Sequence, residues 1–223
     1  MNHALGTTAT TSSLPTRLPR LADAEFEYIR TYVHDRSAIV LDDTKQYLVQ
    51  TRLATVLRDT GLPSFAALVG ELRRRPHGDV GVAVIEAMTT NETSFFRDGH
   101  PFDAVSDHIV PELMARKPDA SITVWCGACS SGQEPYSLAI ALWEKHPALM
   151  RAGRVRIIAT DIAPSMVERC REGRYSTLEV NRGLPARYLV RYFEQSGTDW
   201  VVRPELRSVV DARELNLTAP WTG

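Results

Sequence analysis

The spacing of apolar residues divides the chain into a helical first part and a second part in which strands alternate with helices. From residue 21 to about residue 88, apolar side chains recur every three or four positions, the period of a helix that buries one face. The apolar positions of the first two predicted helices are Phe26, Ile29, Tyr32, Val33, Leu48, Val49, Leu53, Val56 and Leu57. Residues 21–88 are therefore expected to form a small all-α domain.

Cap residues predict where these helices begin and end. Gly61, followed by Pro63, predicts the end of the second helix. Ser64 is expected to begin the third helix, and Asp79 is a predicted N-cap for a fourth. Residues 1–20 are rich in Thr, Ser and Pro and show no apolar period, so we expect a disordered tail there.

The second part of the chain opens with an apolar strand, a turn of small residues and a helix. The strand covers residues 122–125, and Pro135 is expected at the first position of the helix, where a missing N–H is harmless. After this helix, predicted over residues 136–145, a second strand over residues 154–161 ends in Asp161. This order is typical of a βαβ unit in a parallel α/β sheet.

The turn over residues 126–134 has the composition of a ligand-binding loop. Gly127 and Gly132 lack the Cβ that would keep a ligand from the backbone, so Gly127 is a predicted cofactor contact. A phosphate-binding loop would need Lys and Ser or Thr after the second glycine, where this chain has Gln133 and Glu134, and a dinucleotide fingerprint would need a Gly-x-Gly start. A loop that carries a carboxylate favours a ligand with positive charge and hydroxyl groups, such as S-adenosylmethionine. A tight turn without a ligand is the alternative.

Asp161 stands at the carboxyl end of the second predicted strand. A carboxylate at this place in an α/β sheet can accept hydrogen bonds from both hydroxyl groups of a ribose. Because Ala163-Pro164-Ser165 is expected to begin another helix, Asp161 can also serve as a cap. The two roles are compatible.

Composition limits the classes of partner. The formal net charge is −1, which argues against bulk electrostatic attraction to nucleic acid or to an anionic membrane. No stretch is long and apolar enough to span a bilayer, and the first residues lack the apolar core of a signal peptide. Cys126 and Cys129 have the spacing of a redox or zinc motif, but no second Cys/His pair completes a metal site. We therefore expect no metal and two small buried side chains.

Further motifs lie on both sides of the βαβ unit. They are Thr89-Thr90-Asn91-Glu92-Thr93-Ser94-Phe95-Phe96-Arg97-Asp98, the turn from Cys129 to Ser137, Ala159-Thr160-Asp161-Ile162, Gly173-Arg174-Tyr175, Arg182-Gly183-Leu184-Pro185, Arg191-Tyr192-Phe193 and Leu215-Asn216-Leu217. In these motifs and in their order, from about residue 21 onward, the chain resembles the chemotaxis receptor methyltransferases, the CheR family. Several motifs in order are far more specific than one glycine turn.

The resemblance implies a fold and a domain organisation. The fold is α/β, with a Rossmann-like class I S-adenosylmethionine-dependent methyltransferase domain over residues 101–223. An all-α domain for receptor recognition, residues 21–88, precedes it, and a linker over residues 89–100 contributes to the active site. Because the family continues beyond the last motif into further strands, the methyltransferase domain is expected to be C-terminally incomplete here, as part of a longer protein.

Residues 200–203 and 207–210 look like short strands outside the βαβ unit. The resemblance places both in a small β-subdomain, about residues 174–211, inserted in the methyltransferase domain. In some family members this subdomain binds the C-terminal peptide of a receptor by strand addition. A lid over the cofactor is the alternative.

The resemblance also implies a reaction. S-adenosylmethionine would methylate glutamate side chains of methyl-accepting chemotaxis receptors in the cytoplasm, giving glutamyl methyl esters and S-adenosylhomocysteine. By motif position, Glu134 and Asp161 would hold the methionine and ribose parts of the cofactor. The other residues carried over are Asn91, Thr93 and Arg97 around the cofactor and reaction centre, and Asn216 and Leu217 near the adenine.

Arg97 is the predicted catalytic residue. A glutamate carboxylate is already ionised at neutral pH, so the reaction needs no general base and depends on positioning and on exclusion of water. The guanidinium fork of Arg97 can orient such a carboxylate. The plainer alternative is an ion pair with Asp98 or Asp103.

Basic residues of the helical domain are the candidate receptor contacts. Lys45, Arg52 and Arg58 would face the Glu-rich helices of the receptor, and Arg52 matches the family's Arg-Leu position. A solvated surface is the alternative for each of these charges. A second class of function also stays open, a non-catalytic signalling or scaffold module that keeps the cofactor pocket.

Overall fold

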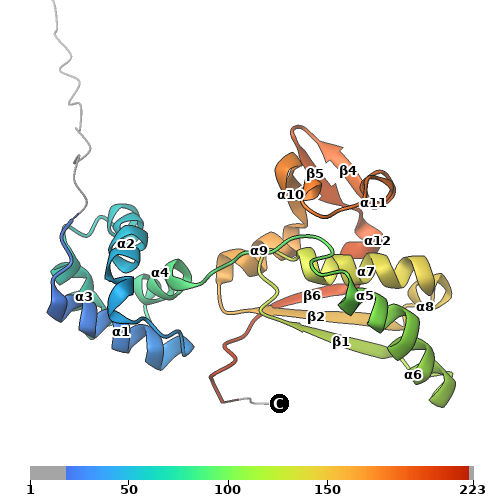
Figure 1. Ribbon diagram of the computed structural model, residues 1–223, viewed down its shortest axis with the longest axis horizontal. Coiled ribbons are helices and arrows are strands. Elements are labelled where there is room, and N and C mark those ends of the chain that lie inside the picture. The colour runs from blue at the N-terminus through green and yellow to red at the C-terminus, as the bar shows by residue number, and fades with distance from the viewer. Residues whose placement is uncertain (1–18, 221–223) are drawn as a thin grey trace, which may run out of the picture. The chain divides into compact units, whose positions relative to one another are not determined.

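The computed structural model describes residues 19–220, which form two compact units (Figure 1). The helical unit contains residues 19–34 and 40–87, and the sheet unit contains residues 35–39 and 88–220. The expected disordered tail, residues 1–20, lies almost wholly outside the described residues. None of the described helices combines the length and the apolarity needed to cross a bilayer.

The helical unit is built from amphipathic helices. Its elements are α1 (Asp23–Ser37), the 3₁₀-helix η1 (Asp43–Lys45), α2 (Gln46–Thr60), α3 (Phe65–Arg74) and α4 (Asp79–Met88). The predicted apolar faces of α1 and α2 are buried, and only Leu48 among the predicted positions is half-buried. The helical period therefore identified the core of this unit correctly.

Two of the three predicted caps are confirmed. Gly61 ends α2 with a left-handed φ of 70°, and the Ser64 hydroxyl accepts a hydrogen bond from the Ala67 N–H at 3.2 Å. The prediction for Asp79 is wrong by one position. Asp79 is the first residue of α4, and the Val82 N–H donates to the carbonyl of Gly78, which stands at the cap.

The sheet unit has a parallel three-stranded main sheet. Its strands are β1 (Ile122–Gly127), β2 (Val155–Asp161) and β6 (Val210–Glu214), in the order β1-β2-β6. The crossover from β1 to β2 runs through α7 (Gln133–Lys145) and α8 (Pro147–Arg151), as the βαβ pattern predicted. The helix α7 begins two residues before Pro135, directly after Gly132, which has a left-handed φ of 97°.

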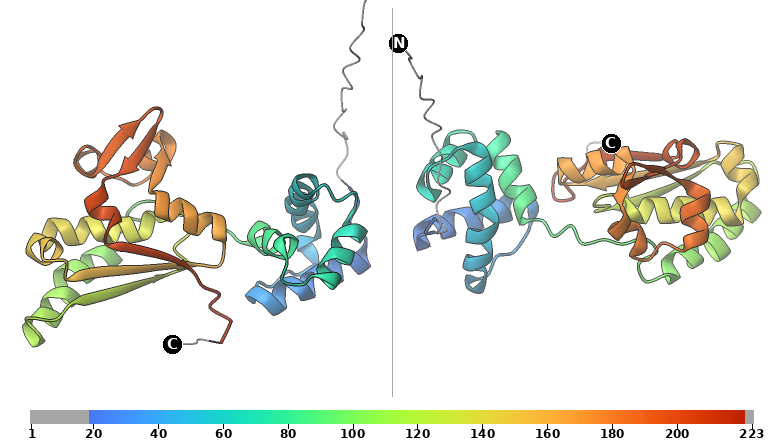
Figure 2. Two further views of the ribbon diagram at one scale, coloured as in Figure 1. Left: turned by 180° about the vertical axis from the view of Figure 1, so that it is seen from behind. Right: turned by 90° about the horizontal axis from the view of Figure 1, so that it is seen from above.

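The two faces of the main sheet differ in burial. On one face Cys126, Ile157 and Ala159 belong to a buried cluster that includes Ile140 of α7. On the other face Trp125 is 46% exposed. Helix α7 therefore packs on the apolar face of the sheet (Figure 2).

The remaining helices of the sheet unit lie before β1 and after β2. Before β1 they are α5 (His100–Asp103), the π-helical η2 (Ala104–Ile109) and α6 (Val110–Arg116), and directly after β2 comes α9 (Pro164–Glu172). Asp161, the last residue of β2, therefore lies close in sequence to the start of a helix, as predicted.

A small antiparallel sheet follows α9. Its strands are β3 (Arg174–Ser176), β4 (Phe193–Ser196) and β5 (Asp199–Val202), in the order β3-β5-β4. The short helices around them are α10 (Thr177–Asn181), α11 (Ala186–Tyr192) and α12 (Pro204–Arg207). Figures 1 and 2 show this sheet on the α7 side of the main sheet.

The predicted strand at residues 200–203 corresponds to β5, but the one at residues 207–210 is wrong. Arg207 is the last residue of α12, which Pro204 begins at a position where proline is favoured. Val210 is the first residue of β6, which pairs with β2 in the main sheet. The small sheet therefore takes its last strand from residues before 203.

Candidate functional site

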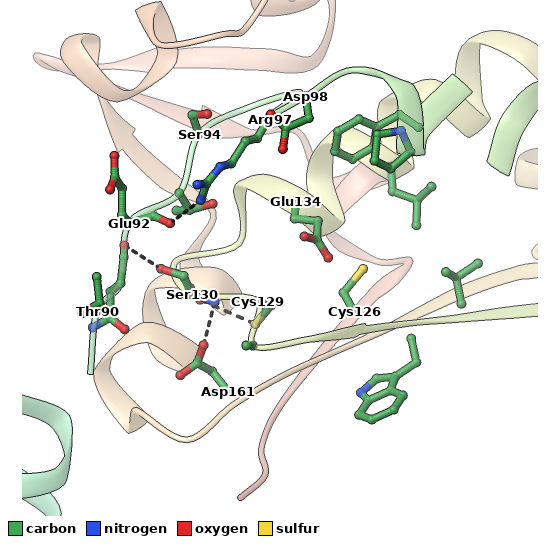
Figure 3. Close-up of a pocket in the computed structure, with 18 of the residues that line it drawn as sticks. Thr90, Glu92, Ser94, Arg97, Asp98, Cys126, Cys129, Ser130, Glu134 and Asp161 are labelled. Carbon is green, nitrogen blue, oxygen red and sulfur yellow. Dashed lines mark hydrogen bonds between the residues drawn. The ribbon is translucent and has the colours of Figure 1, made fainter. Parts of the chain in front are cut away.

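A cavity of about 430 Å³ opens at the carboxyl ends of β1 and β2 (Figure 3). Residues from the turn after β1, from the first turns of α7 and from the end of β2 line one side of it. Residues 89–98, which precede α5 and are called the facing segment below, line the other side. Open α/β sheets bind ligands at this edge, so the topology and the cavity agree.

The turn after β1 holds the carboxylate of Asp161. Ala128 and Ser130 have left-handed φ angles of 56° and 50°, which aims the Ser130 N–H at Asp161 Oδ2, 2.7 Å away. The Ala163 N–H donates to Oδ1 of the same carboxylate at 2.9 Å. Asp161 is only 6% exposed, yet each of its oxygens keeps a lone pair for a ligand hydroxyl. The capping contact and an open ligand position thus coexist at this residue.

The two glycines of the turn have different surroundings, and the cofactor contact of Gly127 stays a prediction. Gly127 ends β1 and does not line the cavity, and a Cβ added there would meet only the ring of Trp125, at 3.5 Å. A Cβ on Gly132 would lie 2.7 Å from Cys170 Sγ and 2.9 Å from Tyr175 Oη. Gly132 is therefore required by its left-handed backbone and by packing against the protein interior, and not by the approach of a ligand.

Glu134 lines the cavity from the first turn of α7. Negative charge is favoured at this end of a helix. Beneath it, burial raises the pKa of the Cys126 thiol, and the neighbouring Glu134 carboxylate raises it further.

Cys126, Cys129 and Cys170 are free and buried, as expected for the first two. Within residues 19–220 no group of His, Cys, Asp and Glu is arranged to hold a metal ion.

The facing segment brings Asn91, Thr93 and Arg97 to the cavity. The Ser130 hydroxyl donates to the Asn91 carbonyl at 3.0 Å, which ties this segment to the turn that holds Asp161. Arg97 Nη1 donates to the Glu92 carbonyl at 3.2 Å (Figure 3). Among the described residues Arg97 forms no ion pair with Asp98 or Asp103, so the plainer alternative for this arginine is absent.

Glu92, also on the facing segment, pairs with an arginine from beyond α10. Arg182 Nη2 lies 2.6 Å from Glu92 Oε1. The hydrogen bond and charge of Arg182, together with the charge of Arg97, lower the pKa of the Glu92 carboxyl. Glu92, which lines the cavity, thus lies near the positive charges of two guanidinium groups.

Asn216 and Leu217 lie outside this cavity. They line a smaller adjoining one of about 110 Å³, and Ala128, Asp161 and Ile162 line both. The Asn216 side chain organises its own loop, since its Oδ1 accepts from the Thr218 N–H at 3.0 Å. The two cavities therefore meet at Asp161, with the predicted adenine residues on one side and the facing segment on the other.

Sequence comparison identifies the family. The all-α domain of CheR methyltransferases matches residues 24–89, and their SAM-binding domain matches residues 91–222. Chemotaxis protein methyltransferase Cher2 of Pseudomonas putida is 38% identical over 197 residues, covering 86% of this chain and 71% of the relative. Chemotaxis protein methyltransferase 1 of Pseudomonas aeruginosa is 41% identical over 200 residues, covering 88% and 72%. The Escherichia coli chemotaxis protein methyltransferase is 36% identical over 203 residues, covering 89% and 68%. The chain belongs to the CheR methyltransferase family.

Membership in the CheR family fixes the fold and the cofactor. The sheet unit is a Rossmann-like methyltransferase domain, and its cofactor is S-adenosylmethionine. The geometry fits this cofactor. Asp161 has open lone pairs where ribose hydroxyls would bind, and Glu134 supplies negative charge near a cationic ligand.

The candidate receptor residues lie in the helical unit. Lys45 ends η1 and is exposed, Arg52 donates from Nη1 to the Ala87 carbonyl at 3.3 Å, and Arg58 pairs with Asp59 at 3.0 Å. Arg52 and Arg58 are six residues apart on α2, which places them about 120° apart around the helix axis, so they do not share one face. A single surface can therefore include Arg52 or Arg58 but not readily both.

Sequence reasoning missed several residues that shape the cavity. Ser130 joins Asp161 to the facing segment, and Glu92 pairs with Arg182. The signal for Ser130 was a small hydroxyl residue in a turn, a residue type that bonds to nearby backbone. No local signal pointed to Glu92, because its partner lies 90 positions later in the chain.

Proposed function

We propose that this CheR family protein transfers the methyl group of S-adenosylmethionine to glutamate side chains of chemotaxis receptors, giving glutamyl methyl esters and S-adenosylhomocysteine. One observation carries the proposal: Asp161, Glu134 and Arg97 line a single cavity at the ligand-binding edge of the sheet. Two carboxylates suit a cationic cofactor, and a guanidinium suits an anionic substrate.

The roles of the residues follow from their placement. Asp161 holds the ribose hydroxyls, Glu134 attracts the methionine amino group, and Asn91 and Thr93 close the cavity from the facing segment. Asn216 and Leu217 receive the adenine in the adjoining cavity. Asp161 suits its role because two backbone N–H groups already fix its orientation.

Catalysis in this proposal consists of positioning. When bound, the cofactor supplies an activated methyl group on a sulfonium. Arg97 orients the substrate carboxylate for in-line attack, and the surrounding residues exclude water from the nucleophile. A carboxylate nucleophile needs no proton removed at neutral pH, so no base is assigned.

The helical unit is proposed to contact the receptor in the cytoplasm. Lys45 and Arg52 supply positive charge toward Glu-rich receptor helices, with Arg58, on another face of α2, as the alternative to Arg52. This charge would act mainly on encounter and register. The edge strands β3 and β4 of the small sheet offer a place for strand addition by a receptor C-terminal peptide.

The deciding experiment uses the full-length protein, S-adenosylmethionine labelled in its methyl group, and the cytoplasmic fragment of a chemotaxis receptor from the same genome. We expect label on the receptor that mild base releases as methanol, the behaviour of a carboxyl ester. Cofactor binding by calorimetry without any transferred label would instead indicate a non-catalytic cofactor-binding module. Label that resists base would reject a glutamyl ester.

A further inference from the structure

The backbone around Arg97 is strained. Phe96 and Asp98, its two neighbours, have left-handed φ angles of 49° and 65°, and Gly99 follows with 60°. Residues with a Cβ rarely adopt this conformation, and such outliers persist only where the surroundings impose them. The direction of the Arg97 side chain therefore depends on whatever holds this turn in place.

A buried hydroxyl of α7 holds the turn. The Phe96 N–H donates to Ser137 Oγ at 2.9 Å, and the same hydroxyl donates to the Gln133 carbonyl at 2.6 Å. Because the single proton of the hydroxyl is used within α7, its oxygen is left to accept from Phe96. Ser137 is fully buried and does not line the cavity, so it acts on the reaction through the groups that it contacts, and the Phe96 N–H connects it to the turn at Arg97.

Serine is a poor choice for this position on local grounds. Alanine has the higher helix propensity and would bury no polar group in the middle of α7. Serine therefore stabilises something other than the helix, and in this structure the additional contact is the Phe96 N–H, 41 positions earlier in the chain.

Other contacts fix the same turn from its far side. The Phe96 ring lies 5.4 Å from the Phe102 ring and 5.5 Å from the Tyr188 ring, between centroids. These contacts hold the side chain of Phe96, while Ser137 holds its backbone. Removing the hydroxyl should thus loosen the backbone at Arg97 without unfolding the segment.

We propose that Ser137 is a positioning residue for Arg97. Through Arg97, the Ser137 hydroxyl affects the rate of methyl transfer and leaves cofactor affinity nearly unchanged. The inference rests on the proposed function, because Arg97 must orient the substrate for its position to matter. Asp161 is held by the Ser130 and Ala163 N–H groups, contacts that do not involve Ser137, so the ribose side of the cavity should be preserved.

The test compares full-length wild type, Ser137→Ala, Arg97→Ala and the double variant. The matched control is Ser131→Ala, which removes another buried hydroxyl of the same region whose proton goes to Gln133 Oε1 and not to the facing segment. The measurements are kcat for methyl transfer to a receptor cytoplasmic fragment, the Kd of S-adenosylhomocysteine, and the melting temperature.

We expect Ser137→Ala to lower kcat about tenfold or more and to keep the Kd of S-adenosylhomocysteine within about threefold of the wild-type value. Small misplacements of an orienting group lower the rate and leave the affinity nearly unchanged. Ser131→Ala should keep kcat near that of the wild type. In the Arg97→Ala background, removing the Ser137 hydroxyl should cause no further loss.

An unchanged kcat in Ser137→Ala would overturn the inference. So would a double variant that is slower than Arg97→Ala by the same factor by which Ser137→Ala is slower than the wild type. If Ser137→Ala does not fold, Ser137→Cys, with a similar volume and a weaker acceptor, should fold and lose part of the rate. Failure of both to fold would make Ser137 purely structural. A wild type that methylates no receptor would reject the proposed function itself, a different outcome from an active wild type with an insensitive Ser137.

Discussion

The two sides of the cofactor cavity are held in different ways. On the sheet side, Asp161 ends a strand and is fixed by two backbone N–H groups from nearby turns. On the facing side, Arg97 lies in an irregular segment fixed by side chains from elsewhere, Ser130 and Ser137 among them. Backbone donors are part of the fold itself, whereas each side-chain contact depends on one residue. The cofactor side should therefore tolerate remote substitutions better than the catalytic side.

The largest expected effect comes from removing the arginine on the facing side. Arg97→Ala should lower kcat by about 100-fold or more, because the guanidinium is the group that orients the substrate carboxylate. The melting temperature should stay close to that of the wild type, since Arg97 is exposed and its side chain donates a hydrogen bond to a backbone carbonyl, that of Glu92. Steady-state kinetics with the receptor fragment measure the loss. Near-normal turnover would remove Arg97 from the mechanism.

A second substitution probes the sheet side. Asp161→Asn should weaken binding of S-adenosylhomocysteine by about 10- to 100-fold, because a hydrogen bond to a charged group is lost and one amide N–H₂ must face a backbone N–H. Thermal stability should fall as well, since one of the two N–H groups that donate to Asp161, that of Ser130 or that of Ala163, loses its acceptor. Calorimetry and thermal melting give both numbers.

Glu134→Gln is the matched control for that experiment. Glu134 is exposed to the cavity and is not held between two backbone donors, so its variant should lose affinity without losing stability. Equal losses of stability in the two variants would contradict the distinction drawn for the sheet side.

The difference between the sheet side and the facing side of the cavity also bears on which structural features the sequence could predict. Strands β1 and β2 and the position of Asp161 follow from apolar runs and from the place of one carboxylate, which are local patterns. Strand β6 was missed because its sequence, Val-Asp-Ala-Arg-Glu, is polar, and only pairing with β2 makes it a strand. Local propensity does not contain that information.

Predictions for the residues of the candidate site meet the same limit of local sequence information. Four of the residues that pattern and family resemblance predicted, Asn91, Thr93, Glu134 and Asp161, line one cavity, and their roles there stay predictions. The cofactor contact of Gly127 stays a prediction, because the absence of a Cβ does not say which neighbour is close, and the nearest group here is the ring of Trp125. The contacts of the facing segment join residues about 40 to 90 positions apart, and a single sequence carries no signal for such pairs.

A smaller effect is expected away from the cavity, in the helical unit. Arg52→Glu should raise the KM for the receptor fragment about three- to tenfold and leave the Kd for S-adenosylhomocysteine unchanged, because reversed charge opposes encounter with Glu-rich helices. Arg58→Glu, on another face of α2, is the matched comparison. The same rise in both variants would indicate a general charge effect, and no rise in either would exclude α2 from the receptor surface.

The smallest effect is expected at the Glu92–Arg182 pair, and its pH dependence tests whether exposed side-chain contacts stabilise the facing segment at all. The pair holds the Glu92 pKa below its ordinary value of 4.5. The contribution of the pair to the free energy of unfolding is therefore fully present above about pH 4.5 and is lost as the pH falls through the lowered pKa. Both side chains are 60% exposed, so Arg182→Gln should lower the melting temperature at neutral pH by no more than about 2 °C. Below the lowered pKa the variant and the wild type should melt together. A difference that persists in acid would mean that Arg182 stabilises the protein through contacts other than the Glu92 carboxylate.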